Sequence, residues 1–230
     1  MITPLGKTEF SHGSPTATRG TLRVSETFCS RQGEGLLTGT ESFFVRTSGC
    51  NLRCWFCDTP YASWSPQGEN LSVEAIVDQY TASGLGHVVL TGGEPMLPRD
   101  VVSLSRELRR AGAHITIETA GTVDREVECD LMSVSPKFQS SGPDRSRFAS
   151  DQQHRRWHAL HHQRRRPFET MKRLIARANA HQLKFVVDSP DDYSELIEIV
   201  ERTGIEANHV WVMPQGSTNE AMDAALEWLK

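Results

Sequence analysis

Short runs of β-branched and aromatic residues alternate along most of this chain with stretches whose apolar residues recur every three or four positions. Such runs predict strands, and such spacing predicts helices. The predicted strands cover residues 43–47, 87–91, 114–118, 131–135, 183–187 and 209–213. The predicted helices cover residues 72–83, 100–111, 168–180, 191–203 and 218–229. Ser72 and Asp100 are predicted helix starts, because their side-chain oxygens can accept from free backbone amides.

A strand followed by a helix, repeated, is typical of an α/β fold with a parallel sheet and right-handed crossovers. Eight full repeats of a β/α barrel need roughly 250 residues. A chain of 230 residues with six predicted strands therefore predicts an incomplete, TIM-like β/α barrel of about six parallel strands. Ligands of such folds bind at the carboxyl ends of the strands, so the segments that follow strands are the candidates for function.

The domain organisation follows from composition along the chain. Residues 1–20 are rich in Thr, Ser, Gly and Pro and have no apolar periodicity, which indicates a flexible N-terminal extension. Residues 21–230 then predict a single domain. Residues 139–167 break the alternation of strands and helices and carry seven Arg and four His, which indicates a basic insertion.

Three histidines of this insertion, His154, His158 and His162, recur every four residues. On a helix they would share one face and form a potential metal site. The simpler interpretation is a solvated basic loop, because no Cys or paired carboxylate completes such a site. A third reading is that the insertion binds an anionic partner.

Charge and cysteine content restrict the class of protein. A net charge of −4 and a pI near 6.1 argue against a dedicated nucleic-acid-binding surface, which is typically strongly basic. No stretch has the length and hydrophobicity of a membrane span, and no signal sequence is recognisable, so we expect a cytoplasmic protein. Five cysteines, three of them clustered, do not indicate a disulfide framework.

The clustered cysteines are Cys50, Cys54 and Cys57, in a C-x3-C-x2-C run. Three thiolates can hold three irons of a cubane cluster and leave the fourth iron open for chemistry, whereas a structural zinc takes four protein ligands. The alternatives are redox thiols, or a zinc site completed by a distant histidine or by Cys29 or Cys129. Cys29 and Cys129 are isolated in the sequence and are otherwise expected to behave as small hydrophobic residues.

A second motif, Thr91-Gly-Gly-Glu-Pro95, follows directly on the predicted strand over 87–91. Two glycines let the backbone approach a ligand closely and expose its amides, while Glu94 can offer a carboxylate to an amino group. A tight turn without any ligand would also explain the glycines.

Together, the two motifs resemble those of the radical S-adenosylmethionine (SAM) superfamily, in which an aromatic residue, here Phe56, precedes the third cysteine. The resemblance implies a [4Fe-4S] cluster bound by the three cysteines, with SAM held at the open iron. Six further segments narrow the resemblance to the 7-carboxy-7-deazaguanine synthase family, over roughly residues 22–216: residues 26–35, Arg46, and residues 57–60, 118–122, 135–137 and 184–187.

Members of that family convert 6-carboxy-5,6,7,8-tetrahydropterin to 7-carboxy-7-deazaguanine with loss of ammonia, a step towards queuosine, with magnesium bound beside SAM. The resemblance also implies a homodimer and an electron donor such as flavodoxin. Two rivals stay open on the sequence alone. One is a radical SAM activase of a glycyl-radical enzyme, and the other is a noncatalytic zinc or iron–sulfur module.

The site residues that the resemblance implies fall into three groups, and none is assigned a catalytic role beyond the cluster and cofactor. The pterin substrate is expected to contact Arg31, Gln32, Gly33, Glu34, Arg46 and Thr91. SAM is expected to contact Phe56, Cys57, Asp58, Gly92, Gly93, Glu94, Ser135, Pro136, Lys137, Pro214 and Gln215. Thr59 is expected at magnesium. Ala120 departs from the asparagine frequent in the family, and the C-terminal residues match no family segment.

Overall fold

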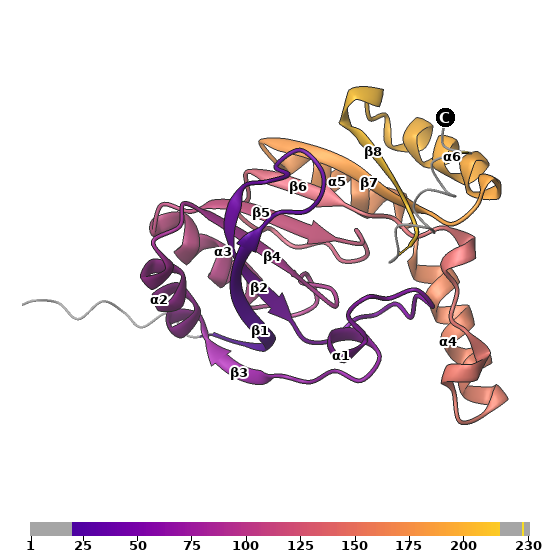
Figure 1. Cartoon of the computed structure of the whole chain (residues 1–230), viewed down its shortest axis with the longest axis horizontal. Helices are drawn as coiled ribbons and strands as arrows, with labels where there is room; N and C mark the ends of the chain where they lie inside the picture. Colours follow the sequence, from indigo (N-terminus) through magenta and orange to yellow (C-terminus); the bar gives the residue numbers. More distant parts are fainter. Residues whose placement is uncertain (1–19, 217–226, 228–230) are drawn as a thin grey trace, which may run out of the picture.

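A computed structural model describes residues 20–216 and Glu227. Its single sheet has eight strands in the order β3-β1-β2-β4-β5-β6-β7-β8. The last six are parallel to one another, and helices pack along the outside of the sheet that they form (Figure 1): β2 (Glu41–Thr47), β4 (His87–Gly92), β5 (His114–Thr119), β6 (Leu131–Val134), β7 (Ala180–Val187) and β8 (Val210–Pro214). The predicted partial barrel of about six parallel strands is confirmed.

Two further strands, β1 (Thr21–Arg31) and β3 (Glu69–Ser72), run antiparallel along the edge of this sheet. Neither was predicted. In β1 only Leu22 and Val24 point into the core in alternation, and most of the remaining residues are polar and exposed or half-buried. A half-buried edge strand of this kind lacks the continuous apolar run that marks a central parallel strand.

Four helices lie close to their predicted positions: α2 (Val73–Ser83), α3 (Val101–Arg110), α5 (Phe168–Arg177) and α6 (Tyr193–Thr203). Ser72 caps α2 as expected, with its hydroxyl accepting from the amide of Ala75. Asp100 makes no capping bond to α3 and instead accepts from the amide of Thr21. Extending the third helix to residue 180 was wrong, because Ala180 already belongs to β7.

The predicted basic insertion contains a helix, α4 (Asp151–Arg164), so the interpretation as a loop was wrong. Another unpredicted helix, α1 (Pro60–Ser63), follows the cysteine run. His158 and His162 lie side by side on α4 with their Nε2 atoms 3.2 Å apart, while His154 contacts the carbonyl of Pro143. Within the described residues no three His, Cys, Asp or Glu side chains converge as ligands of one ion, so a His-face metal site is not supported.

The core lies between the parallel strands and the helices that cover them. Strand residues such as Val45, Leu90 and Ile117 are fully buried against helix residues such as Ile76 and Leu104. Burial of each large aliphatic side chain contributes about 1.5–3 kcal/mol, so this layer fixes the strand ends in space. No helix in the described ranges has the length and apolarity to cross a membrane. Residues 1–19 of the predicted extension and most of the predicted helix over 218–229 lie outside the described residues.

Candidate active site

A cavity of about 520 Å³ opens at the carboxyl ends of the parallel strands. Its wall combines segments that follow β2, β4, β5, β6 and β8 with part of β1. All of the predicted cluster, SAM, substrate and magnesium residues line it except Glu94 and Pro136. Residues separated by up to 184 positions, such as Arg31 and Gln215, therefore face one space, as expected for a site at the carboxyl ends of the strands.

The three cysteines lie in the loop between β2 and α1, and all three line the cavity. Burial raises the pKa of the Cys50 thiol to about 12 and that of Cys54 to about 11. Cys57 contacts the hydroxyl of Ser63 at 3.0 Å. A buried thiol gives up its proton when a metal ion binds the sulfur, so these side chains fit a site whose positive charge comes from bound iron. In a cubane each thiolate binds a different iron, so the sulfurs need a common cavity rather than a common point.

The two glycines after β4 are required by the backbone of the cysteine loop. A Cβ atom on Gly93 would lie 2.2 Å from the carbonyl oxygen of Gly49 and 2.6 Å from that of Ala62. Gly92 has a φ of +131°, and a Cβ there would lie 2.3 Å from the carbonyl oxygen of Thr47. The glycines therefore let the cysteine loop and the loop after β4 pack in direct contact, and both still face the cavity.

Glu94 is fully buried and does not line the cavity. Its carboxylate accepts hydrogen bonds from the hydroxyls of Thr119 and Thr122 and from the amides of Met96 and Ala120. Burial raises the pKa of this carboxyl, although the hydrogen bonds oppose the shift. In this structure Glu94 joins the loop after β4 to the loop after β5. Pro136 is likewise buried away from the cavity, between two residues that line it.

The cavity wall also carries the residues expected at the substrate. Gln32 is buried, and its side-chain amide donates to the hydroxyl of Ser42. Arg46 pairs with Glu26 at 2.6 Å and lies over the ring of Phe28. The Tyr61 hydroxyl also donates to Glu26, and this bond, with Arg46, holds the pKa of that carboxyl below its usual range against the effect of burial. Arg46 is thus an oriented cation at the cavity wall.

Lys184 is buried in the wall and pairs with two carboxylates, a pairing that the sequence did not predict. Lys184 lies between Glu34, at 2.7 Å, and Glu118, at 3.3 Å. Burial lowers the pKa of Lys184, but the two carboxylates outweigh it and raise the pKa overall. The available signal was a lysine within an apolar strand, at 183–187, because such a lysine needs a charged partner.

Two smaller polar contacts complete the site. The hydroxyl of Thr59 donates to the Asp58 carboxylate at 3.2 Å and lies 3.8 Å from the Cys57 sulfur, and all three residues line the cavity. Lys137 donates to the hydroxyl of Ser135 at 2.7 Å, and both line the cavity.

Residues of the basic insertion form hydrogen bonds with the cysteine loop. His161 is buried, and its Nδ1 accepts from the backbone amide of Arg53 while its Nε2 contacts the Ser141 hydroxyl. Burial lowers the pKa of His161 to about 3, so the ring is neutral and can accept through Nδ1. Trp55 donates to the carbonyls of Ser140 and Ser141.

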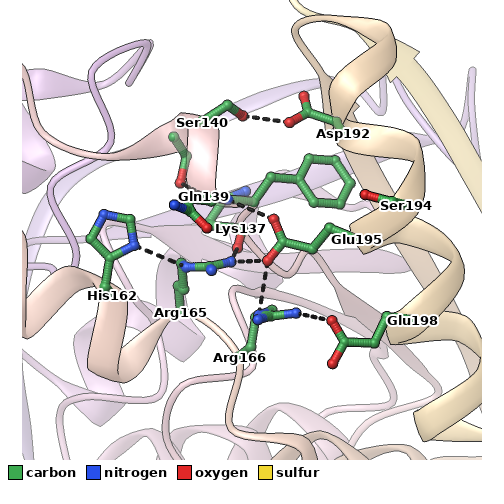
Figure 2. A network of polar contacts seen from close by, with 12 residues as sticks. Lys137, Gln139, Ser140, His162, Arg165, Arg166, Asp192, Ser194, Glu195 and Glu198 are labelled. Carbon is green, nitrogen blue, oxygen red and sulfur yellow. Dashed lines mark hydrogen bonds and ion pairs between the residues drawn. The ribbon is translucent and has the colours of Figure 1, made fainter.

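The end of α4 is tied in turn to α6 (Figure 2). Arg165 contacts the Glu195 carboxylate and donates to the carbonyl of Lys137, while Arg166 pairs with Glu195 and Glu198. The network connects the helix of the insertion, the Ser135–Lys137 segment at the cavity and α6. It therefore fixes part of the predicted SAM-binding wall.

Comparison with known proteins agrees with this geometry. The family model of the radical SAM superfamily matches residues 44–179. A 7-carboxy-7-deazaguanine synthase of Rhodopirellula baltica is 55% identical over 218 residues, which cover 95% of this chain and 82% of that protein. A 7-carboxy-7-deazaguanine synthase of Halobacterium salinarum is 41% identical over 228 residues, or 96% of this chain and 88% of that protein.

Among solved structures, QueE from Escherichia coli superposes with a TM-score of 0.62 at 24% identity, over 90% of this chain and 89% of that one. This likeness confirms the fold. The matches over nearly the whole length remove the glycyl-radical activase and the noncatalytic metal module from consideration. The chain belongs to the 7-carboxy-7-deazaguanine synthase family of the radical SAM superfamily.

Proposed function

We propose that this protein converts 6-carboxy-5,6,7,8-tetrahydropterin to 7-carboxy-7-deazaguanine with loss of ammonia, as a step towards queuosine. The observation that carries the proposal is that a single cavity holds both the three cysteines and the polar residues expected at a pterin, among them Gln32, Glu34 and Arg46. The near full-length similarity to proteins named as this synthase supports the same reaction.

Membership of the radical SAM superfamily implies a [4Fe-4S] cluster and SAM as cofactors. Cys50, Cys54 and Cys57 would hold the cluster, and the segments around Gly93 and Lys137 would hold SAM. When bound, the reduced cluster and SAM supply a carbon-centred radical that removes a hydrogen atom from the substrate. The protein's part is to hold the substrate against that radical and to keep water and other reactants out of the cavity.

For the substrate, the guanidinium of Arg46 suits a carboxylate, since it is planar and permanently charged. Its pairing with Glu26 keeps the guanidinium oriented before substrate arrives. The side-chain amide of Gln32 and the carboxylate of Glu34 can pair with the donors and acceptors of a pterin edge. Lys184 pairs with Glu34 at 2.7 Å and so holds its carboxylate in place.

We also propose that magnesium binds in the cavity at the hydroxyl oxygen of Thr59. Mg²⁺ is a hard cation that takes oxygen ligands and completes its shell with water and substrate oxygens. The neighbouring Asp58 carboxylate adds negative charge at this point. A homodimer in the cytoplasm, served by a flavodoxin-like electron donor, completes the proposal.

The direct test is to incubate the reconstituted, reduced enzyme anaerobically with SAM, magnesium and the carboxypterin. The deazapurine product is expected by mass spectrometry and ultraviolet absorption. Its absence, with an intact cluster and continued SAM cleavage, would overturn the assignment.

The residue assignment is tested with Arg46→Ala, which should raise the KM for the carboxypterin at least about tenfold, the effect of roughly 1.4 kcal/mol. Cleavage of SAM without substrate should change little. Arg106→Ala, an exposed residue of α3, is the matched control and should behave as the wild type. A normal KM in Arg46→Ala would remove this residue from the substrate site.

A further inference from the structure

Beside the cavity, three side chains from different elements meet at one carboxylate oxygen. The Oε1 atom of Glu26 accepts from Nε of Arg46 at 2.6 Å and from the hydroxyl of Tyr61 at 2.7 Å. Glu26 belongs to β1, Arg46 to β2 and Tyr61 to α1. Arg46 lines the cavity, whereas Glu26 and Tyr61 are not among the residues that line it. The carboxylate and the hydroxyl can therefore act on a ligand in the cavity only through the guanidinium.

An irregularity in β1 determines which residue faces Arg46. Val24 lies opposite Thr47 on β2. An unbroken antiparallel ladder would then place Ser25 opposite Arg46. The register instead shifts by one residue, and Glu26 takes that place. A bulge of this kind leaves one residue unpaired and redirects the side chains beside it, and such bulges are frequent next to active sites. The backbone of β1 thus places a carboxylate opposite the arginine of the cavity wall.

The guanidinium of Arg46 is held on two sides. Its Nε donates to Glu26, and its central carbon lies 5.4 Å from the centre of the Phe28 ring. That ring is itself stacked on the ring of Phe44, with the two centres 4.9 Å apart. Within the described part of the chain, no hydrogen bond or ion pair involves Nη1 or Nη2 of Arg46. Both terminal nitrogens can therefore donate to a ligand in the cavity.

The hydroxyl of Tyr61 fixes the orientation of the Glu26 carboxylate. A carboxylate beside a guanidinium often forms two parallel hydrogen bonds, for which it can use Nε together with one Nη. The side chain of Glu26 is 40% exposed, so packing restrains its rotation little. Tyr61 donates to the same oxygen that accepts from Nε, and its bond is the largest of the effects that lower the pKa of Glu26. This bond opposes rotation of the carboxylate towards Nη and leaves both terminal nitrogens available.

We propose that Tyr61 is a positioning residue for the carboxylate of the substrate. Acting through Glu26, it keeps Nε of Arg46 occupied, so that the substrate carboxylate is bound end-on by Nη1 and Nη2. The inference rests on the proposed function, because the carboxypterin is the ligand that presents this carboxylate. Two parallel donors match the two oxygens of a carboxylate in both geometry and charge. The arrangement therefore selects a pterin that carries a carboxylate over one that lacks it.

The test measures equilibrium binding to the reconstituted holoenzyme with SAM, so that its readout does not depend on turnover. The probes are two fluorescent, fully oxidised analogues, 6-carboxypterin and pterin, which differ only in the carboxylate. Tyr61→Phe removes the hydroxyl and keeps the ring. Tyr80→Phe is the matched control, because it makes the same change on α2, where the ring packs against Phe43 and does not line the cavity.

Tyr61→Phe should bind 6-carboxypterin about three- to tenfold more weakly than the wild type and should bind pterin equally well. The loss is smaller than that of a buried hydrogen bond to a charged group, because Tyr61 is 36% exposed. In turnover, the KM for the carboxypterin should rise by the same factor, while kcat changes by less than about twofold. Tyr80→Phe should match the wild type with both probes.

A double-mutant cycle distinguishes action through Glu26 from direct contact with the ligand. In the Glu26→Ala background, Tyr61→Phe should cause no further change in the affinity for 6-carboxypterin. Arg46→Lys tests the end-on pair, because an ammonium group keeps the charge but has no two parallel donors. Its affinity for 6-carboxypterin should fall at least about tenfold, and adding Tyr61→Phe should not change it further.

Wild-type affinity of Tyr61→Phe for 6-carboxypterin would overturn the proposal. So would an equal loss for both probes, a wild type that binds both probes equally, or an effect of Tyr61→Phe that persists in the Glu26→Ala background. Wild-type binding by Arg46→Lys would refute the end-on pair. If the wild type gave no deazapurine from the carboxypterin, the proposed function would fail, while the binding comparison would still decide the role of Tyr61.

Discussion

The ion network at the end of α4 provides a quantitative test of how the insertion is held, through Glu195→Gln. The side chains of Arg165 and Glu195 are only 6% and 14% exposed, so their charges are largely removed from water. Glutamine keeps the size of the side chain and can still accept from the amide of Gln139, but it removes the negative charge. Arg165 then keeps only neutral partners, the carbonyl of Lys137 and the ring of His162.

Removing one partner of a buried ion pair costs about 3–5 kcal/mol, because the other charge stays buried and unpaired. The lower figure is expected here, about 3 kcal/mol, since glutamine preserves part of the hydrogen bonding. For a chain of this size one kcal/mol corresponds to about 2–4 °C in Tm, so Glu195→Gln should lower Tm by about 6–12 °C.

The assay is thermal unfolding of the anaerobic holoenzyme, followed by far-ultraviolet circular dichroism. The matched control is Lys172→Ala, which breaks an exposed pair with Glu169 whose side chains are 46% and 76% exposed. Such a pair contributes at most about 0.5 kcal/mol, so Tm should shift by no more than about 2 °C. Equal shifts in the two variants would refute the reasoning that this network is a buried, stabilising connection.

Three further predictions concern the cysteine loop and its supports. Cys54→Ala should abolish the visible absorption of the cluster and all turnover, whereas Cys129→Ala should keep both, as read from anaerobic spectra and iron content. Gly93→Ala should give little soluble, cluster-containing protein, because its Cβ would clash with the carbonyl oxygen of Gly49; a normal yield would show that the two loops can separate. His161 has its pKa lowered by burial to about 3, so between that pH and about 6.5 only the unfolded state binds its proton, and stability falls as pH decreases through this window. From pH 6.5 to 5 the free energy of unfolding of the wild type should fall by roughly 2 kcal/mol more than that of His161→Gln, measured through the difference in Tm between the two pH values. Equal decreases of Tm in the two proteins would contradict this prediction.

The parallel strands were predictable because each contains an apolar run, buried on both faces in central strands such as β4, where Val88, Val89 and Leu90 are all fully buried. The helix α4 was not, because its sequence has no apolar stripe. It is held by tertiary contacts of single residues, such as the packing of Trp157 on the Arg53 guanidinium and the hydrogen bond from the Arg53 amide to His161. Local periodicity contains no record of such contacts.

In the site, too, some features were predictable from the sequence and others depended on tertiary contacts. Motifs placed the cavity correctly, because segments that follow parallel strands must gather at one edge of the sheet. The burial and the partners of individual side chains were harder to predict. Glu94 is buried and accepts four hydrogen bonds, some of them from the loop after β5. Lys184 pairs with one carboxylate in the loop between β1 and β2 and with another in β5. These pairings depend on distance in space between segments that are remote in the chain.

The bond between His161 and the amide of Arg53 joins positions 108 residues apart, and this has a consequence for biosynthesis. A ribosome adding about 5–20 residues per second needs roughly 5–20 s to make the segment that separates them. The cysteines therefore leave the ribosome well before the helix that supports their loop exists. Delivery of iron and sulfide to a nascent chain would meet an unsupported loop, so maturation of this enzyme is expected to follow completion of synthesis.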